Sequence, residues 1–204
     1  MHRIVVRPLF AALLLLASLF GSAPAHAAVT VAFWSHEFGN SFPHAFVTLR
    51  GVMDAGGEPV DLAYGFTARS VTPMLLMKTV GGRIEVPTPG YIRSSDAQFS
   101  VVLSDAQYGA MRALIAGWDA KTGDARYNLN SRNCVHFVKE AARIAGLTQL
   151  DRPGLMKRPR SYLLAVEAAN AGRVTVVNMP GKQYLKTLPK LSIASPVATP
   201  TTVR

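Results

Sequence analysis

The sequence has little that would cross-link the chain or hold a bound metal. Only one of its 204 residues is cysteine, which excludes an internal disulfide and leaves the hydrophobic core to stabilise the fold. Neither Cys-x-x-Cys nor His-Glu-x-x-His spacing occurs. The glycine pairs at 56–57 and 81–82 lack the strand-to-helix setting of a phosphate loop. We therefore expect no metal site and no cofactor.

Long hydrophobic runs are also scarce, and the one near the start has the three parts of a secretory signal peptide. Arg3 and Arg7 form a basic beginning, residues 9–20 are apolar, and Ala-His-Ala at 25–27 matches a cleavage site. No later stretch approaches the roughly 20 apolar residues of a transmembrane helix. We expect export to the periplasm or the medium of a bacterial cell, with 177 residues left to form one domain.

Acidic residues are few, with 12 against 22 basic ones. Without Arg3 and Arg7 the balance is 20 to 12, a net charge of +8. This surplus favours anionic partners such as cell-wall polymers, lipid head groups or carboxylate-rich substrates, although it also serves solubility. Nucleic acid is disfavoured, because the chain carries an export signal and no recognisable nucleic-acid-binding module. The sequence leaves the oligomeric state open.

Short β-branched and apolar runs predict an antiparallel sheet at the start of the mature chain. Strands are expected at residues 29–33, 44–49 and 58–66. Residues 34–43 are rich in turn formers and predict a loop, and Asp-Ala-Gly-Gly at 54–57 predicts a hairpin turn. Consecutive strands joined in this way are typical of antiparallel neighbours.

The middle of the chain alternates between strand and helix patterns. Residues 83–86 and 98–103 predict strands, and Ser104 is placed to cap a helix over residues 105–118. Residues 70–80 fit either a short buried helix or a loop over the core. The fold class predicted from these elements is α+β, an antiparallel sheet packed with helices.

The prediction divides the mature chain into three parts. Residues 28–150 form the main domain, and residues 151–188 form a C-terminal extension with a helix at 161–169 and a possible strand at 174–177. Residues 189–204 turn to Ser, Pro, Thr and Ala, a composition typical of a disordered tail.

The single cysteine stands at the start of the best-marked helix of the chain. Asn133 is a preferred N-cap residue, so Cys134 is expected in the first turn, and Gly146 is placed to end the helix. Apolar residues recur at helical spacing at Phe137, Val138, Ala141, Ile144 and Ala145. Unpaired N–H groups and the helix dipole both favour thiolate, the nucleophilic form of cysteine.

A thiol nucleophile needs a base, and His44 is the candidate. His136 follows Cys134 by two residues, about 200° of rotation around a helix, so it points away and is expected to be structural. His44 opens the strand at 44–49, where a polar imidazole at the edge of an apolar strand must find a partner. A lone cysteine on an apolar helix face can equally be a small buried hydrophobe.

The two segments together carry a resemblance. A histidine strand, Pro-His-Ala-Phe-Val-Thr-Leu around His44, followed by the Asn-Cys-x-His-Phe helix start at Cys134, resembles the circularly permuted papain-like superfamily. That superfamily includes lecithin:retinol acyltransferase-like proteins, PPPDE peptidases and permuted relatives of NlpC-type cell-wall peptidases. The resemblance spans roughly residues 29–147 and implies a permuted papain-like fold, with the histidine strand before the cysteine helix.

The resemblance also implies residue roles. Cys134 would be the nucleophile and His44 the base and then the acid, with Asp61 on the following strand orienting the imidazole and Tyr64 behind it. A Cys-His dyad without a third member and a degenerate, inactive site both stay open.

Further residues are candidates for binding the substrate. The oxyanion would be held by the Cys134 N–H, with His36 or Asn40 from the loop at 34–43 adding to it. Tyr127 would be a pocket wall or part of the core.

These expectations converge on an exported cysteine hydrolase that attacks an amide or ester carbonyl. Peptide amides of peptidoglycan are the first substrate class and lipid acyl esters, handled by an acyltransferase or thioesterase, the second. The alternative is a non-catalytic domain of the same fold that binds envelope polymers.

Overall fold

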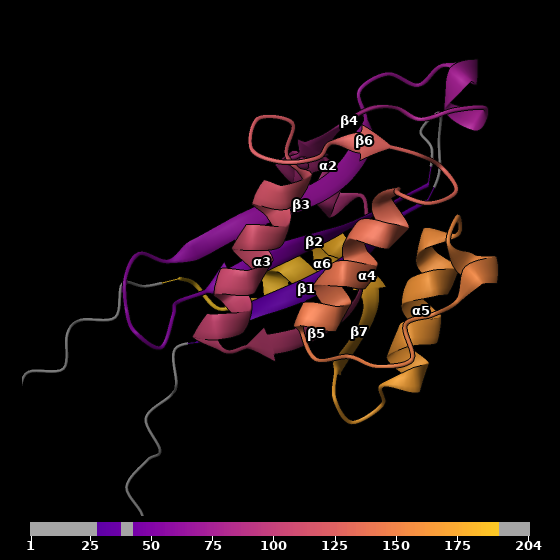
Figure 1. Ribbon diagram of the computed structural model, residues 1–204. Helices are drawn as coiled ribbons and strands as arrows, with labels where there is room; N and C mark the ends of the chain where they lie inside the picture. The colour runs from indigo at the N-terminus through magenta and orange to yellow at the C-terminus, as the bar shows by residue number, and fades with distance from the viewer. Residues whose placement is uncertain (1–27, 38–42, 192–204) are drawn as a thin grey trace, which may run out of the picture.

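The computed structural model describes residues 28–37 and 43–191, so the predicted signal peptide, Asn40 and residues 192–204 lie outside the described residues. Within them, seven strands form one antiparallel sheet in the order β6-β4-β3-β2-β1-β5-β7 (Figure 1). The strands are β1 (Val29–His36), β2 (His44–Gly51), β3 (Val60–Ala68), β4 (Val80–Glu85), β5 (Asp96–Leu103), β6 (Arg126–Tyr127) and β7 (Thr175–Pro180). Together with the helices this is an α+β architecture.

Helices cover both faces of the sheet (Figure 1). They are α2 (Pro89–Arg93), α3 (Asp105–Trp118), α4 (Cys134–Ile144), α5 (Pro159–Ala169) and α6 (Gly181–Thr187), with short 3-10 helices η1 (Pro73–Leu76) and η2 (Pro153–Leu155). In the described part of the chain, none of them has the length and apolarity to cross a bilayer.

Alternation along the central strands assigns each residue to one of two cores. Val31, Ala45 and Val47 point to the face covered by α3, α4 and α5, where most buried side chains gather. Trp34 and Phe46 point to the opposite face and pack with Tyr184 of α6 in a smaller cluster. The cysteine helix therefore lies on the large core, and α2 and α6 lie on the small one.

β1 is longer than the sequence predicts. Residues 34–36 were expected in a loop, but Trp34 is fully buried against Phe46, and its Nε1 donates to Thr48 Oγ1 at 2.9 Å. Ser35 is also buried and accepts from Gln98 Nε2 at 3.0 Å. These contacts with β2 and β5 continue the strand, so His36 stands directly opposite His44.

The segment at 70–80 combines the two readings that its sequence allowed. It contains the 3-10 helix η1, with Leu75 buried, and ends in β4, which starts at Val80 rather than residue 83. The sequence prediction missed α2, α6 and the two-residue strand β6. These elements are seven residues or fewer, too short for a periodic hydrophobic pattern.

Residues beyond 150 extend the same sheet and core. α5 begins two residues before its predicted start and packs against β1 and β5, with Leu163 and Val166 fully buried in the large core. β7 forms the outermost strand beside β5, with Asn178 at φ 43° and Pro180 at its end. The opposite outermost strand, β6, has only two residues.

Candidate functional site

The start of α4 is fixed by a buried cap. Asn133 Oδ1 accepts from the N–H of Val135 at 2.8 Å and of His136 at 3.2 Å, while its Nδ2 donates to the carbonyls of Leu129 and Met156, each at 2.8 Å. The Asn133 N–H in turn donates to His136 Nδ1 at 3.3 Å. His136 therefore completes the cap, the structural role expected from its spacing, and Cys134 occupies the first position of the helix.

The thiol of Cys134 is neutral in this environment. Burial raises the pKa of the thiol to about 11, because a thiolate loses its hydration inside the protein. The N–H groups of Ala45, Val135 and Cys134 itself oppose this rise, but they are smaller effects than burial. From the sequence we expected the start of the helix to favour the thiolate. The N–H groups there do lower the pKa of the thiol, but desolvation raises it by more.

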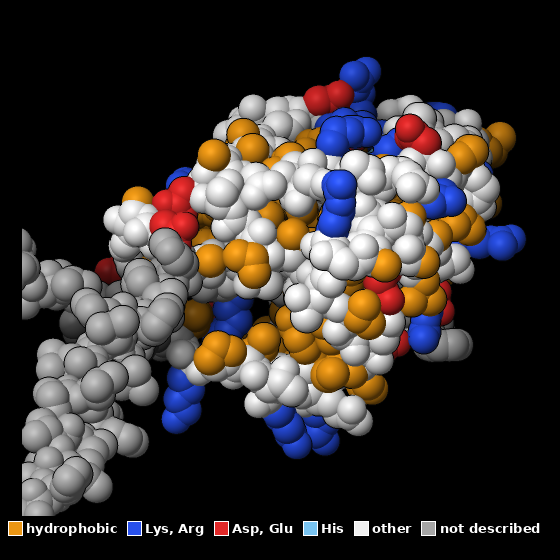
Figure 2. Space-filling model, turned by 90° about the horizontal axis from the view of Figure 1, so that it is seen from below, with side chains coloured by type: hydrophobic (Ala, Val, Ile, Leu, Met, Phe, Trp, Pro, Cys, Tyr) orange, Lys and Arg blue, Asp and Glu red, His pale blue; other side chains and the backbone are white. Residues whose placement is uncertain are grey.

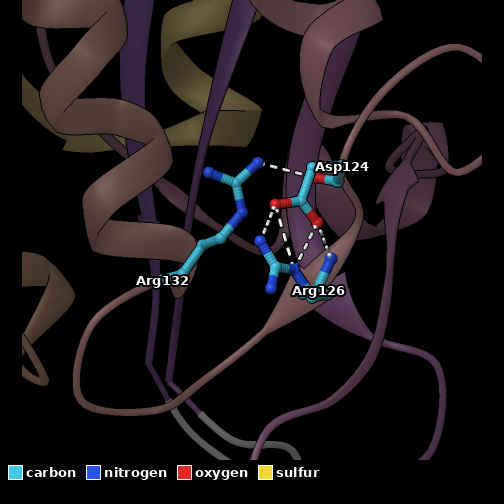
Figure 3. A network of polar contacts seen from close by, with 3 residues as sticks. All are labelled: Asp124, Arg126 and Arg132. Atoms are coloured by element: carbon cyan, nitrogen blue, oxygen red, sulfur yellow. Dashed lines mark hydrogen bonds and ion pairs between the residues drawn. The ribbon is translucent and has the colours of Figure 1, made fainter.

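The loop before Cys134 is held by an arginine cluster (Figure 3). The Arg132 guanidinium lies 3.6 Å from the centre of the Trp118 ring, and its Nη2 donates to the Asp124 carbonyl at 2.6 Å. The Asp124 carboxylate is bound by Arg126, with 2.8 Å between Oδ2 and Nη2, which holds the pKa of Asp124 well below its usual range. Because Arg132 directly precedes the cap Asn133, these contacts help to fix the position of Cys134.

His44 is buried and lacks a partner for one ring nitrogen. Its imidazole stacks against Phe46 and meets the edge of Tyr91, with ring centres 6.4 and 6.5 Å away. Among the described residues no group hydrogen-bonds its Nε2. Burial first, and the nearby His36 second, lower the pKa of His44 to about 4. A buried nitrogen without a partner is costly in a folded protein and invites a functional explanation.

Cys134 and His44 approach one cavity from opposite faces of the sheet. The cysteine comes from α4 on the large core, and the imidazole lies beside Tyr91 of α2. The β2–β3 ladder ends at the Phe46–Gly65 pair, so beyond it the two strands no longer bond to each other. Both residues line a cavity of about 370 Å³ at this opening. Within the described residues no hydrogen bond joins the thiol to the imidazole.

Gly65 leaves space for the His44 ring, and the residue opposite Gly65 on the next strand is acidic. A Cβ at Gly65 would lie 2.5 Å from His44 Nε2, so no side chain fits there while the ring keeps its place. Glu85 stands directly opposite Gly65 on β4 and lines the same cavity. Its Oε1 is 3.4 Å from Arg83 Nη2, a long and exposed ion pair. The Glu85 carboxylate is therefore held only by an exposed contact where it lines the cavity.

Glu85 and Tyr91 were missed by the sequence analysis. Tyr91 lines the cavity, and burial, followed by the charges of Glu85 and Cys134, raises the pKa of its hydroxyl. Neither residue belongs to a recognisable motif. The sequence feature that could have indicated this region is Gly65, because a glycine inside a strand often marks a place where another group approaches the backbone closely.

Two of the predicted binding residues lie at or near this site. Tyr127 is 7% exposed, lines the cavity, and has its hydroxyl pKa raised by burial and by Cys134. His36 does not line the cavity; its Nδ1 is 3.0 Å from Ser95 Oγ, and its ring stacks on Tyr91 at 4.2 Å. Asn40 lies outside the described residues. Tyr127 therefore lies near the thiol, whereas His36 packs against Tyr91 outside the cavity.

Asp61 and Tyr64 do not take the positions expected for them. Asp61 is paired with Arg50 both in strand register and in an ion pair, and its side chain is 64% exposed. Arg50 is six residues along β2 from His44, roughly 20 Å at the rise of a strand. Tyr64 stands opposite Val47 and lines a separate cavity of about 480 Å³. Asp61 therefore cannot orient the imidazole, because it sits at the other end of the strand pair.

A second, basic cavity of about 770 Å³ adjoins the site and shares Lys157 with it. Its other cations are Lys139, Arg152 and Arg158, and of these only Lys139 forms an ion pair, with Asp151, within the described residues. These cations favour anionic groups beside the site. The described chain holds no cluster of three or more His, Cys, Asp or Glu side chains that could bind a metal ion.

Comparison with known proteins places the chain in no family. No protein-family model matches it, and no curated protein does. A solved structure of the type VI secretion system effector TseH matches over 76% of this chain and 100% of that chain, with a TM-score of 0.49 and 14% identity.

Proposed function

We propose that the protein is a cysteine hydrolase of permuted papain-like fold, with Cys134 as nucleophile and His44 as base. The observation that carries this proposal is the convergence of a helix-capped thiol and a buried imidazole, one ring nitrogen unbonded, on a single cavity. A histidine strand that precedes the cysteine helix in the chain is the order implied by the permuted superfamily.

The third member of the site is Glu85 rather than Asp61. In the reacting complex the Glu85 carboxylate accepts a hydrogen bond from His44 Nε2–H across Gly65, which raises the low pKa of the imidazole. Nδ1 is then the nitrogen that removes the thiol proton. Catalytic hydrogen bonds are often long in ligand-free enzymes and shorten when substrate binds.

The chemical sequence has two halves. The thiolate sulfur bonds to the carbonyl carbon while the Cys134 N–H stabilises the oxyanion, and the bond to the leaving nitrogen or oxygen breaks as His44 donates its proton. Water, deprotonated by His44, then attacks the acyl carbon, the carbon–sulfur bond breaks to release the acid, and the imidazolium returns its proton to the Cys134 sulfur. The thiol and imidazole are both neutral before substrate arrives, so His44 acts as a general base rather than as half of a preformed ion pair.

The substrate is envelope material with an amide or ester carbonyl, peptide amides of peptidoglycan first and lipid esters second. The basic cavity that shares Lys157 supports an anionic group beside the scissile bond. The export expected from residues 1–27 brings the protein to that compartment.

The test is turnover of peptidoglycan peptides and ester lipids by matched variants. Cys134→Ala should abolish turnover, and Glu85→Gln should reduce kcat at least about 100-fold, since a neutral amide cannot stabilise the imidazolium as a carboxylate does. Asp61→Asn is the control, because it removes a carboxylate remote from the cavity. Equal losses in Glu85→Gln and Asp61→Asn would remove Glu85 from the site, and full activity of Cys134→Ala would end the proposal.

A second candidate function is a non-catalytic domain that binds anionic envelope polymers. It is favoured by the raised pKa of the thiol, the lowered pKa of His44 and the unpaired cations of the basic cavity. This function requires polymer binding that weakens with salt and persists in Cys134→Ala and His44→Ala, with no turnover by any variant.

The ionisation of Cys134 itself gives a further prediction. The rate of alkylation by iodoacetamide should rise about tenfold per pH unit and level off only near pH 11, where the folded thiol titrates. In denaturant the same thiol should level off near the free value of about 8.5. A plateau below that value in the folded protein would show that the thiol is more hydrated or more strongly bonded than this geometry implies.

A further inference from the structure

The connection between β3 and β4 projects from the body of the protein and exposes apolar side chains. In Figure 1 it is the magenta loop with η1 at the upper right. We define the apolar lobe by four of its residues, whose exposed fractions are 60% for Val71, 41% for Met74, 66% for Leu76 and 81% for Met77. Single exposed hydrophobic residues are ordinary, but four within seven positions of one projecting loop indicate an interaction surface.

The backbone of this connection is anchored, so the exposure is built into the fold. Leu75 is buried at 5% and holds the middle of η1 against the large core. At the base of the loop the Arg69 N–H donates to the Gly81 carbonyl at 2.9 Å, and Arg69 Nε donates to the Gly82 carbonyl at 3.1 Å. The four lobe residues stay exposed while Leu75, between them in the chain, is buried.

The charged residues within this connection have one sign. No acidic residue occurs between Asp61 and Glu85, whereas Arg69 and Lys78 flank the lobe and are both exposed. Neither cation forms an ion pair within the described residues. A surface that takes apolar side chains and carries negative charge is therefore complementary to this loop. The head-group and upper acyl region of an anionic bilayer has both properties.

The lobe also adjoins the cavity of the candidate site. Val71 belongs to the lobe and lines that cavity, as does Leu75 just behind it. The lobe and the connection behind it therefore form part of the wall of the cavity.

We propose that the apolar lobe docks the protein on an anionic phospholipid bilayer. Val71, Met74, Leu76 and Met77 enter the interface, Arg69 and Lys78 contact lipid phosphates, and the cavity with Cys134 opens toward the membrane. This docking is a binding property and does not depend on whether the protein is a hydrolase.

The experiment is sedimentation with vesicles of equal parts phosphatidylglycerol and phosphatidylethanolamine, compared with phosphatidylcholine vesicles. Leu76→Ser combined with Met77→Ser should weaken binding to the anionic vesicles at least about tenfold, because both side chains lose their apolar contact with lipid. All variants are made in the chain as recovered from the producing cell, so that each has the same N-terminus.

The matched control changes exposed apolar residues elsewhere. The face seen in Figure 2, on the β5–β7 side of the molecule, also gathers hydrophobic side chains with Lys and Arg projecting around them. Val102 of β5 and Val176 of β7 are 62% and 58% exposed, so Val102→Thr combined with Val176→Thr should leave vesicle binding unchanged.

A fluorophore attached at a single residue tests which part of the protein enters the lipid. In a Cys134→Ala background, an environment-sensitive fluorophore on Met77→Cys should shift to the blue with anionic vesicles, and the same dye on Val102→Cys should not. Absence of binding to anionic vesicles, equal binding by the lobe and control variants, or equal dye shifts at both positions would overturn the proposal. Lobe-dependent self-association without vesicle binding would assign the surface to a second copy of the chain.

Discussion

The β2–β3 strand pair has two unlike ends. At one end Arg50 and Asp61 face each other in register and form an ion pair at the surface. At the other end the ladder stops at Phe46 and Gly65, and the buried imidazole of His44 occupies the space above the glycine. One end satisfies its charged groups with each other, and the other keeps a ring nitrogen without a partner.

This difference separates what the fold needs from what the site needs. An exposed ion pair contributes little to stability and can be exchanged for other polar residues. A buried imidazole without a partner makes the folded state less stable than a hydrophobic residue would, so its presence is explained best by a task other than stability.

Lowering the pH should destabilise the folded protein, because His44 is buried at one end of the β2–β3 strand pair. The folded pKa of about 4 lies below the unfolded value of 6.5, so the unfolded chain binds a proton that the folded chain resists as the pH falls between these values. The free energy of unfolding should therefore drop by about 3 kcal/mol between pH 6.5 and pH 4. Urea denaturation across this range measures it, and His44→Gln should abolish most of the drop, while His36→Gln should keep most of it because burial is the larger cause.

Adding a side chain at Gly65 should have the next largest effect on stability. In Gly65→Ala the new Cβ would lie 2.5 Å from His44 Nε2 and 3.2 Å from Phe46 Cβ, so the ring has to move, at a cost of about 1–3 kcal/mol. Gly109→Ala is the control, since Gly109 lies within α3 and its Cβ would meet nothing within 4 Å. That change should stabilise the helix by up to about 1 kcal/mol. Thermal unfolding that shows equal shifts for both variants would contradict the close approach of His44.

Removing the ion pair at the other end should change least. Asp61→Asn takes away a carboxylate that is 64% exposed and should lower the free energy of unfolding by less than about 1 kcal/mol, with a smaller effect in high salt. Denaturation at low and high ionic strength checks this. A loss as large as that of Gly65→Ala would mean that the two ends are equally important to the fold.

The periodic elements could be predicted from the sequence, and their exceptions have physical reasons. The helix α4 and the strand β2 were predicted within a residue or two because hydrophobic spacing and caps determine them locally. The extension of β1 to His36 depends on cross-strand burial of Trp34, which no local pattern reveals. Short elements such as α2 are set by tertiary contacts rather than by their own sequence.

At the candidate site, the sequence pattern predicted two residues, Cys134 and His44, but not the residues around them. Cys134 and His44 line one cavity as the motif pairing implied. Glu85, the third residue that we propose, could not be predicted, because its position depends on which strand lies beside β3 and on the register of that strand opposite Gly65. Asp61 follows His44 in the chain on the neighbouring strand, yet antiparallel pairing sends it to the far end, and Glu85 on β4 comes opposite Gly65 instead.

The two outermost strands bear on how the protein behaves at high concentration. An open sheet can grow by adding strands from other molecules, and long, flat outer strands are where such aggregation begins. β6 offers only two residues, and β7 is interrupted by the left-handed Asn178 and ends at Pro180, which has no N–H to donate. The sheet therefore resists edge-to-edge polymerisation at both outer strands.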